Sequence, residues 1–381
     1  MTGSRKAALS AALLLLGILV GGLLGEASLR VYSHFNGSFA AQFRGWDPLA
    51  ILIEPHGELG YRQKPQRTFH YWNGTSATSN RMGYRGPLVK LPKPPGTFRV
   101  VLVGGSTSHG WGVNDSETID RFLEAELSHR YPGIKVEVVN LAFDAYDSWQ
   151  AFERLRSDGI RMEPDLVIVN TGINDVRNSR IPGLTDRDSR TLIWEADLAR
   201  MREEERNGGP SAKSLLKHYS YLLRFPGYVR GRIWRQERRA AASALADPFP
   251  EAADYFARNL SRIDSLLGSH SIPAVYSTPP SSLTINFAPD STSTLSYWVV
   301  NASVTQSYRD TLARRMRDFV ARRAGSGRPV WYIHADLPGD RFLDDCHLNP
   351  LGNYSMALDL AGLIDRTGLL LAGGTAEGTN P

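Results

Sequence analysis

The sequence predicts an α/β fold that is built on a parallel sheet and preceded by one membrane-spanning helix. Three observations carry this prediction. Short runs rich in Val, Ile and Leu end in Gly, Asn or Thr, which is typical of strands buried on both faces. Stretches with helical spacing of apolar residues separate these runs, as in right-handed βαβ units. Near the N-terminus, residues 7–25 contain no charged side chain.

The overall composition is that of a large globular domain. The 381 residues, 42% of them hydrophobic, suffice for one large core or for a core with an appended lobe. A single cysteine, Cys346, excludes an internal disulfide framework and a Cys-rich metal site. The net charge is only +5, and the basic residues are spread along the chain and interleaved with acidic ones. We therefore expect no nucleic-acid partner. The sequence contains no internal repeat, which excludes a solenoid.

The uncharged segment at residues 7–25 follows a short basic N-terminus, residues 1–6. At about 1.5 Å per residue, a helix of this length roughly crosses the ~30 Å hydrocarbon core of a bilayer. Arg5 and Lys6 precede it, so residues 1–6 are expected in the cytoplasm and the rest of the chain outside. A cleaved signal peptide is the alternative, but GGLLGEASLR offers only a weak cleavage site. We therefore expect an uncleaved signal anchor that carries a periplasmic or extracellular domain.

Three regions outside the predicted sheet differ in composition. Residues 26–97 are rich in Gly, Pro, aromatics and turn signals, which predicts a stalk and a segment leading into the sheet. Residues of about 176–250 interrupt the alternation with charged helical stretches. Their basic run, RGRIWRQERR, fits a solvated helix face better than a site for an acidic polymer or lipid headgroups. Residues 367–381 are predicted to be a disordered tail.

Strands and helices alternate in order through residues 98–366. The first strand is FRVVLVGG, and the helix SETIDRFLEAELSHRYPG follows it. Next come the strand KVEVVNLA, the helix SWQAFERLRSDGI and the strand PDLVIVNTG. After the interruption the chain continues with the helix AADYFARNLSRIDSLLGSH, the strand IPAVYSTPP, the helix YRDTLARRMRDFVARR and the strand PVWYIHA. The pair Asn349–Pro350 is a good N-cap and first turn for a closing helix.

Polar stretches follow two of these strands and precede the last helix. They are GGSTS, NTGINDV and DDCHLNP. Ligands of open parallel sheets bind at the carboxyl edge, where these stretches are expected to lie. Nucleophilic catalysis by serine needs a hydroxyl, a base and a group that orients the base. Ser106, His347 and Asp344 supply these three types of group. The N–H of Ser106 and the amide of Asn174 are candidates to stabilise an oxyanion.

Each stretch has a plainer interpretation when it is taken alone. A Gly-Gly-Ser turn is usually only a turn, and Asn-Asp after a strand is commonly a cap or turn pair. Asp344 and His347 could also form half of a metal site, but no further His or acid cluster has ligand spacing, so we expect no metal and no cofactor. What favours catalysis is the order of Ser, Asn and Asp-x-x-His at one predicted sheet edge.

With this order the chain resembles the SGNH hydrolases, also called GDSL-type esterases and lipases, over about residues 80–365. GGSTS stands at the nucleophile block, NLAFDAY at the second block, GIND at Gly-x-Asn-Asp and DDCH at Asp-x-x-His. The segment Asn-x-x-Gly-Tyr-Arg-Gly at residues 80–86, together with YSTPP, is similar to the membrane-anchored or exported branch. Two positions depart from the family. Gly105 stands where it usually has Asp, and Ala142 stands where its oxyanion glycine would be.

The resemblance implies a three-layer α/β/α sandwich around a five-stranded parallel sheet, which is an SGNH or flavodoxin-like arrangement. It implies that Ser106 attacks an ester carbonyl, that His347 is the base and that Asp344 orients it, with Asp345 as the rival acid. The implied oxyanion hole consists of Ser106, Ala142 and Asn174. An alanine retains its N–H for this purpose if its φ is negative, whereas a positive φ would be strained. The Gly105 departure is expected to alter the turn rather than to abolish attack.

These inferences predict an exported serine esterase that cleaves O-acyl esters, including O-acetyl esters, on a small molecule or on a cell-envelope or secreted glycan. The same three residues would serve an O-acyltransferase that acts on polysaccharide. Gly105 and Ala142 suggest a third interpretation, a non-catalytic glycan-binding or assembly protein. His109 and Trp111 either line the pocket or pack at the start of the helix. The oligomeric state is left open.

Overall fold

The computed structural model describes residues 3–44, 47–71, 73–181, 183–189, 194–230, 248–280 and 302–373. The chain divides into two compact units. The larger unit contains the sheet and comprises Leu52–Phe69, Thr75–Leu198 and Arg238–Pro381. The smaller unit comprises Met1–Ile51, His70–Gly74 and Ala199–Glu237.

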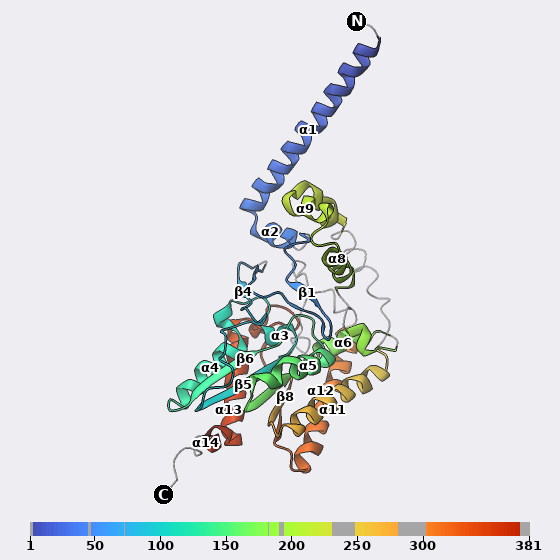
Figure 1. The fold of residues 1–381 in the computed structure, drawn as a ribbon. Helices are drawn as coiled ribbons and strands as arrows, with labels where there is room; N and C mark the ends of the chain where they lie inside the picture. Colours follow the sequence, from blue (N-terminus) through green and yellow to red (C-terminus); the bar gives the residue numbers. More distant parts are fainter. Residues whose placement is uncertain are drawn as a thin grey trace. The chain divides into compact units, whose positions relative to one another are not determined.

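The larger unit is built on a five-stranded parallel sheet in the order β6-β5-β7-β8-β9 (Figure 1). The strands are β5 (Thr97–Gly104), β6 (Lys135–Asn140), β7 (Leu166–Asn170), β8 (Ala274–Thr278) and β9 (Val330–His334). Every residue of β5, β7 and β8 is buried, as expected for central strands covered on both faces. The five apolar runs of the sequence therefore form the predicted strands.

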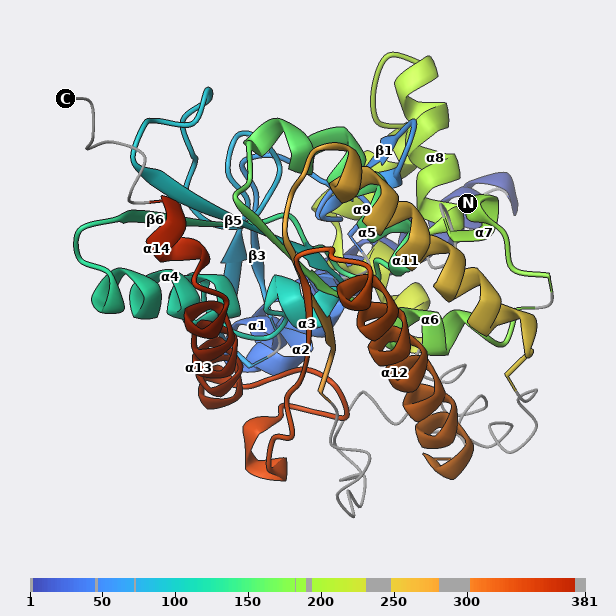
Figure 2. The ribbon, with the colours of Figure 1, turned by 90° about the horizontal axis from the view of Figure 1, so that it is seen from below.

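Helices cover both faces of this sheet (Figure 2). They are α4 (Ile119–Arg130), α5 (Ser148–Arg154), α11 (Glu251–Ser269), α12 (Ala302–Gly325) and α13 (Pro350–Thr367). Val100 and Leu102 of β5 pack with α4 and α13, whereas Val101 and Val103 pack with α5, α11 and α12. Because successive side chains of a strand point to opposite faces, β5 contributes to two cores. The predicted three-layer α/β/α sandwich is confirmed.

Two of these helices, α5 and α13, have N-terminal side-chain caps at the carboxyl edge of the sheet. Asn349 accepts a hydrogen bond from Gly352 N (2.9 Å) at the start of α13, and Pro350 occupies the first turn. Asp147 accepts from Trp149 N and Gln150 N at the start of α5. The cap predicted at Asn349–Pro350 is therefore present.

The segment predicted as a stalk contains strands of its own. They are β1 (Ile53–His56), β2 (Gly60–Gln63), β3 (Thr68–His70) and β4 (Ser76–Thr78), arranged as two two-stranded sheets. Leu52–Phe69 belongs to the larger unit, and Tyr61 is buried there with its hydroxyl donating to Asp144 O. This part of the predicted stalk therefore packs within the unit that contains the sheet, and Tyr61 is one of its buried contacts.

The predicted insert and tail are described only in part. Residues 176–250 contain α7 (Asp186–Ser189), α8 (Glu195–Arg206) and α9 (Ala212–Tyr219), preceded by the end of α6 (Ile173–Asn178). The basic run of the insert begins at Arg230, and its remaining residues, 231–239, lie outside the described part of the chain. The tail differs from its prediction, because α14 (Leu369–Gly373) follows α13 and buries Leu370. Residues 374–381 lie outside the described part.

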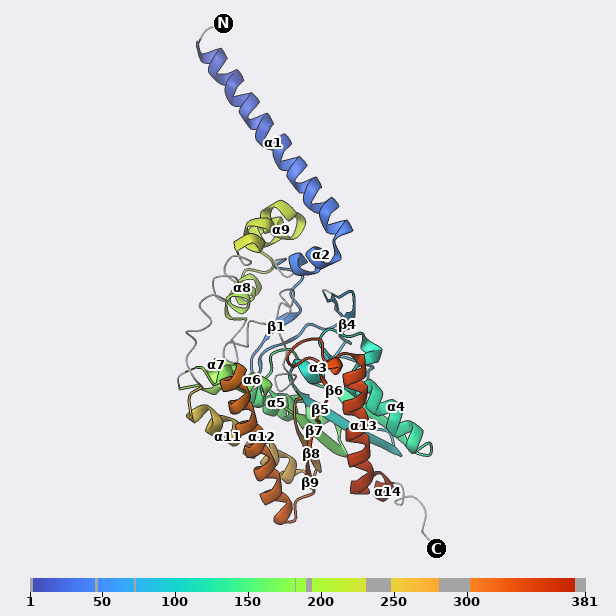
Figure 3. The ribbon, with the colours of Figure 1, turned by 180° about the vertical axis from the view of Figure 1, so that it is seen from behind.

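The smaller unit contains the long N-terminal helix α1 (Gly3–Phe35) and the short helix α2 (Gly37–Arg44), with α9 packed beside them (Figure 3). In the described part of the chain, α1 is the one helix long and apolar enough to cross a membrane. Phe39 and Phe43 of α2 stack at 5.0 Å between ring centroids, and Tyr228 packs edge-on against Phe39. These rings form the small aromatic core of this unit.

Gly104, the last residue of β5, makes a testable contribution to stability. A Cβ atom at this position would lie 2.1 Å from the carbonyl oxygen of Asn170 on the neighbouring strand. We expect Gly104→Ala to lower the free energy of unfolding by about 3 kcal/mol or more, because the backbone must move. Urea unfolding of the full chain in detergent measures this. The control is Gly133→Ala, whose Cβ has no atom within 4 Å; equal stability losses in the two variants would contradict the prediction.

Candidate active site

Three side chains from distant parts of the sequence meet at the carboxyl edge of the sheet. His347 Nε2 lies 2.8 Å from Ser106 Oγ, and His347 Nδ1 lies 2.7 Å from Asp344 Oδ2. Ser106 begins α3 (Ser106–His109) directly after β5, whereas the other two residues lie in the loop before α13. An imidazole held by a carboxylate through Nδ1 can accept a serine proton at Nε2. The structure thus brings together the three residues predicted for catalysis.

The loop that carries Asp344 is folded back on itself. Asp344 Oδ1 accepts hydrogen bonds from the N–H groups of Cys346 (2.9 Å) and His347 (2.8 Å). Thr107 Oγ1 donates to Cys346 O at 3.2 Å, which ties this loop to α3. The spacing Asp-x-x-His therefore serves two purposes. It lets one carboxylate shape the turn and orient the imidazole at the same time.

The electrostatics of the pair follow from burial and charge. Burial by itself would lower the pKa of His347, but the Asp344 carboxylate outweighs it and the pKa is raised. Burial would likewise raise the pKa of Asp344, yet the charge and hydrogen bonds of His347 lower it. Both shifts favour a carboxylate beside an imidazole that takes up a proton readily.

Asp345, the rival acid, has a different environment. Its Oδ1 atom is buried and has no hydrogen-bond partner among the described residues. Burial, followed by the charge of Asp344, raises the pKa of Asp345 to about 7. Asp344 is therefore the carboxylate that contacts the imidazole, and Asp345 contributes only a longer-range charge to His347.

The predicted oxyanion donors are placed differently from one another. Asn174, at the start of α6, donates from Nδ2 to Tyr146 O at 2.9 Å, and a carboxamide has a second N–H. Ser106 is the first residue of α3, so its N–H has no acceptor within the helix. The N–H of Ala142, however, donates to Asn140 Oδ1 at 3.1 Å. The expectation that Ala142 supplies a donor is therefore not supported, because that N–H is used inside the fold.

Ala145, which no sequence motif indicates, has the backbone geometry expected for the missing donor. Its φ is +64°, an unusual value for a residue with a Cβ atom. Among the hydrogen bonds of the described residues, none uses the Ala145 N–H. The strained conformation lies between Phe143 and Tyr146, next to the carbonyl that holds Asn174. Alanine carries no sign of such a conformation in the sequence, whereas a glycine would have indicated it.

Gly105 explains how Asn174 comes close to Ser106. The φ and ψ values of Gly105, −93° and −159°, are open to any residue. A Cβ there would nevertheless lie 2.7 Å from Asn174 Nδ2 and 2.9 Å from Tyr146 O. The missing side chain therefore provides the space in which the Asn174 amide packs against the nucleophile turn.

Two buried carboxylates join the elements on either side of this turn. Asp175, next to Asn174, accepts from Ser148 N at 3.0 Å, and Asp147 accepts from Asn178 Nδ2 and Ser189 Oγ. Burial, followed by the neighbouring charge of Asp147, raises the pKa of Asp175 to about 7. These contacts fix the start of α6 against the start of α5.

Arg85, from the segment Asn80–Gly86, is fully buried and holds the loop that follows α3. Its guanidinium donates to His109 O (2.9 Å) and Val113 O (2.7 Å), and it pairs with Asp115 Oδ1 at 2.7 Å. The same group donates to the carbonyl of Gly110. The motif that resembles the exported branch of the SGNH family thus acts as a clamp on the nucleophile turn.

His109, the last residue of α3, and Trp111, in the loop that follows it, have separate roles. His109 is fully buried, bonds through Nδ1 to Asp144 Oδ1 (3.1 Å) and packs edge-on against Phe143. Trp111 is half-buried, and its ring lies 4.4 Å from the His347 ring, tilted by 34°. Packing is therefore the role of His109, whereas Trp111 forms a wall beside the imidazole.

The sequence matches the GDSL-like lipase/acylhydrolase family over residues 102–354, which is more than half of the chain. The chain belongs to this family. No curated protein matches the sequence. A GDSL-like lipase from Bacteroides thetaiotaomicron is similar at 14% identity and a TM-score of 0.37, over 70% of this chain and 88% of that chain. A family 3 carbohydrate esterase from Clostridium thermocellum is similar at 12% identity and a TM-score of 0.39, over 72% and 98%. An acetyl xylan esterase is similar at 13% identity and a TM-score of 0.37, over 70% and 100%.

Within the site of this acylhydrolase-family chain, three residues of types that can bind a metal ion lie close together. Asp344, Cys346 and His347 bring possible ligand atoms within 4.8 Å of one another in the described residues. Both imidazole nitrogens already make hydrogen bonds, so a metal ion would have to displace Asp344 or Ser106 from the ring. Burial also raises the pKa of the Cys346 thiol well above its usual value. The geometry therefore favours hydrogen bonding over metal ligation.

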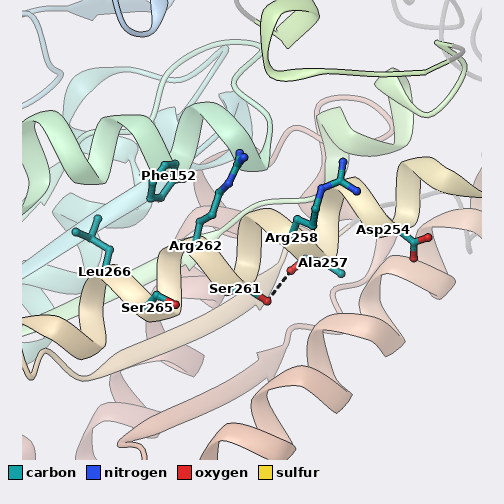
Figure 4. Close-up of a pocket in the computed structure, with 8 residues that line it drawn as sticks. All are labelled: Phe152, Asp254, Ala257, Arg258, Ser261, Arg262, Ser265 and Leu266. Carbon is teal, nitrogen blue, oxygen red and sulfur yellow. Dashed lines mark hydrogen bonds between the residues drawn. The ribbon is translucent and has the colours of Figure 1, made fainter.

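An open groove lies elsewhere on the acylhydrolase domain, between α5 and α11 (Figure 4). Phe152, Arg258 and Arg262 line it, and none of its lining residues is a predicted site residue. Arg262 is paired with Asp186 at 3.0 Å, and Arg258 lies over the Tyr255 ring. Its two cations are thus already engaged within the fold.

The raised pKa of His347 sets the expected pH dependence. The imidazole must be neutral to accept a proton, so kcat/KM is expected to rise with pH along a limb whose pKa exceeds the ordinary 6.5. Asp344→Asn removes the main cause of the upward shift, so the limb moves to lower pH and activity falls by about 10³-fold or more. Ester hydrolysis measured from about pH 5 to 9 tests this. Asp340→Asn, an exposed acid in the same region, is the control; an unmoved limb in Asp344→Asn would contradict the prediction.

The contact between Gly105 and Asn174 predicts strong coupling between two substitutions. Gly105→Ala is expected to displace the Asn174 amide and to lower kcat by about 10²-fold, as the loss of one oxyanion donor does. Asn174→Ala should cause a similar loss, and the double variant should lose little more than either single variant. Steady-state kinetics on the four chains measures the coupling. Fully additive losses, or a fully active Gly105→Ala chain, would show that Gly105 does not act through Asn174.

Proposed function

We propose that this chain is an exported, membrane-anchored serine esterase that cleaves O-acyl esters. The observation that carries the proposal is the pair of hydrogen bonds at His347, 2.8 Å to Ser106 and 2.7 Å to Asp344. Membership of a lipase/acylhydrolase family supports the reaction class. In this proposal Ser106 is the nucleophile, His347 is the general base and Asp344 orients the imidazole.

The proposed reaction proceeds in two halves. Ser106 Oγ attacks the ester carbonyl carbon while its proton passes to His347 Nε2, and the carbonyl oxygen becomes an oxyanion. The C–O bond of the ester then breaks, and the leaving alkoxide takes the proton from His347. A water molecule attacks the acyl-serine with His347 again as base. The acyl group leaves as a carboxylic acid and Ser106 recovers its proton.

Hydrogen-bond donors next to Ser106 support the stabilisation of both oxyanions. We assign the N–H of Ser106 and the second N–H of Asn174 to this role, as the sequence predicts. We assign the third donor to Ala145 in place of Ala142, because the Ala142 N–H donates to Asn140 Oδ1, whereas no hydrogen bond of the described residues uses the Ala145 N–H. Donors held in place before the reaction need no reorganisation as charge develops, which is the main source of such catalysis.

The N-terminal helix supports anchorage outside the cytoplasm. Arg5 and Lys6 precede the apolar stretch of α1, and this charge bias favours a cytoplasmic N-terminus with the rest of the chain exported. An exported esterase meets acylated molecules of the cell envelope or its surroundings. We therefore infer that O-acyl groups, O-acetyl groups among them, on such a small molecule or glycan are the substrates.

The proposal is tested with p-nitrophenyl acetate and the full chain in detergent micelles. Ser106→Ala is expected to lower the rate by about 10³-fold or more, since the nucleophile is lost. The matched control is Ser108→Ala, a buried serine two residues along α3, which should stay within about tenfold of the native rate. Equal rates for the native and Ser106→Ala chains would overturn catalysis by Ser106 and favour a non-catalytic binding protein. Acetyl transfer to an added glycan, in place of acetate release, would identify an acyltransferase.

A further inference from the structure

The segment comprising α9 and the start of the helical stretch at residues 221–230 has an inverted distribution of polar and apolar side chains. Some of its polar side chains contact the rest of the unit: Ser214 is buried against Glu204, and the partly buried His218 has Nδ1 3.0 Å from Asp47. Arg224 is also buried and lies beside Asp47. The exposed large apolar residues of the segment are Leu215, Leu216, Tyr219, Leu222, Leu223 and Phe225. A helix that faces water shows the opposite pattern.

This apolar surface is attached to α1 at the end of the uncharged run. Glu26, the first charged residue after residues 7–25, accepts hydrogen bonds from Tyr221 N (3.0 Å) and Leu222 N (2.8 Å). Leu222 packs on the last apolar turn of α1, since a Cβ at Gly25 would lie 3.4 Å from its Cδ1 atom. The surface therefore lies where α1 changes from apolar to charged, and Figures 1 and 3 show α9 beside the end of α1 that leads into α2.

Cationic and aromatic side chains surround the same level. Arg30 donates to Tyr219 O and lies over the Tyr221 ring at 4.8 Å, and Arg224 lies over that ring at 4.5 Å. Lys213 is exposed on α9. Amphipathic aromatics and basic side chains gather at the boundary between hydrocarbon and headgroups. The composition of the surface thus fits a lipid interface.

From these observations we infer that residues 212–225 form a second membrane contact beside α1. Leu216, Tyr219, Leu222 and Leu223 enter the boundary between acyl chains and headgroups of the outer leaflet. Lys213 and Arg30 remain at headgroup level. The occupant of this surface is the phospholipid bilayer that α1 crosses, so the inference rests on the proposed anchorage. It also requires α1 to remain in the mature chain, because cleavage beyond Glu26 would remove the acceptors that hold residues 220–222.

The test places a fluorescent label at single positions of the full chain in vesicles of phosphatidylcholine and phosphatidylglycerol. Cys346 is the one cysteine of the sequence, so the background is Cys346→Ala. Labels go on Leu216→Cys and Leu223→Cys, and the control is Glu205→Cys, an exposed position on α8 of the same unit. Quenching by doxyl groups on the acyl chains is compared with quenching by aqueous iodide.

We expect doxyl lipids to quench the labels at 216 and 223 at least about twofold more than the label at 205, with the reverse order for iodide. Iodide quenching at 216 and 223 equal to that at 205 would overturn the inference. Protection from both quenchers would also overturn it, because the surface would then be covered by protein. Flotation of the unlabelled chain with the vesicles tests α1 separately. If the chain does not float, the proposed anchorage is wrong. If it floats but iodide quenches the labels at 216 and 223 as strongly as the label at 205, only the second contact is wrong.

Discussion

The candidate site depends on the absence of side chains at the end of β5. At Gly104 the neighbouring strand β7 comes so close that a Cβ would overlap the Asn170 carbonyl, and at Gly105 the Asn174 amide occupies the space of the side chain. Two adjacent glycines therefore let two backbone elements approach the turn on which Ser106 stands. Larger residues here would separate the hydroxyl from its surroundings even if every other site residue stayed in place. Close packing, rather than glycine flexibility, is the requirement, since neither residue has a positive φ.

Around this turn the arrangement is held by buried charged groups that have hydrogen-bond partners. Arg85 is surrounded by carbonyl oxygens and Asp115, and Asp147 and Asp175 are surrounded by hydroxyl, amide and backbone donors. A buried charge without such partners would be strongly destabilising. The hydrogen bonds have defined directions, which apolar packing lacks. They can therefore hold α3, α5 and α6 in one relative arrangement, and the positions of Ser106 and Asn174 follow from it.

The sequence predicts the sheet and its flanking helices through local patterns, whereas the meeting of Ser106, Asp344 and His347 is predicted from their order at one sheet edge and from the resemblance to the SGNH hydrolases. Buried strands are continuous apolar runs, and Asp-x-x-His is a spacing that one turn of backbone can close. It failed where the decisive property was a backbone conformation. Ala142 and Ala145 are the same residue type three positions apart, and only the fold shows which one has φ of +64° and an unused N–H. The clamp at Arg85 was equally hidden, since its acceptors are carbonyl oxygens, which every residue carries. The reason for Gly105 lay in Asn174, which is distant in sequence.

The smaller unit also contains a feature that sequence patterns alone do not predict. Composition alone favours a solvated interpretation of the insert, because its helices are rich in charge and its apolar residues are scattered. The meaning of Leu216, Tyr219 and Leu223 changes once Glu26 is known to hold residues 220–222 against α1. The amphipathic pattern of a helix says that it has two faces, but the solvent on each face is set by what lies beside it. Here the neighbour is an apolar helix about two hundred residues earlier in the chain, and the proposed lipid contact of α9 follows from that neighbour rather than from the sequence of α9.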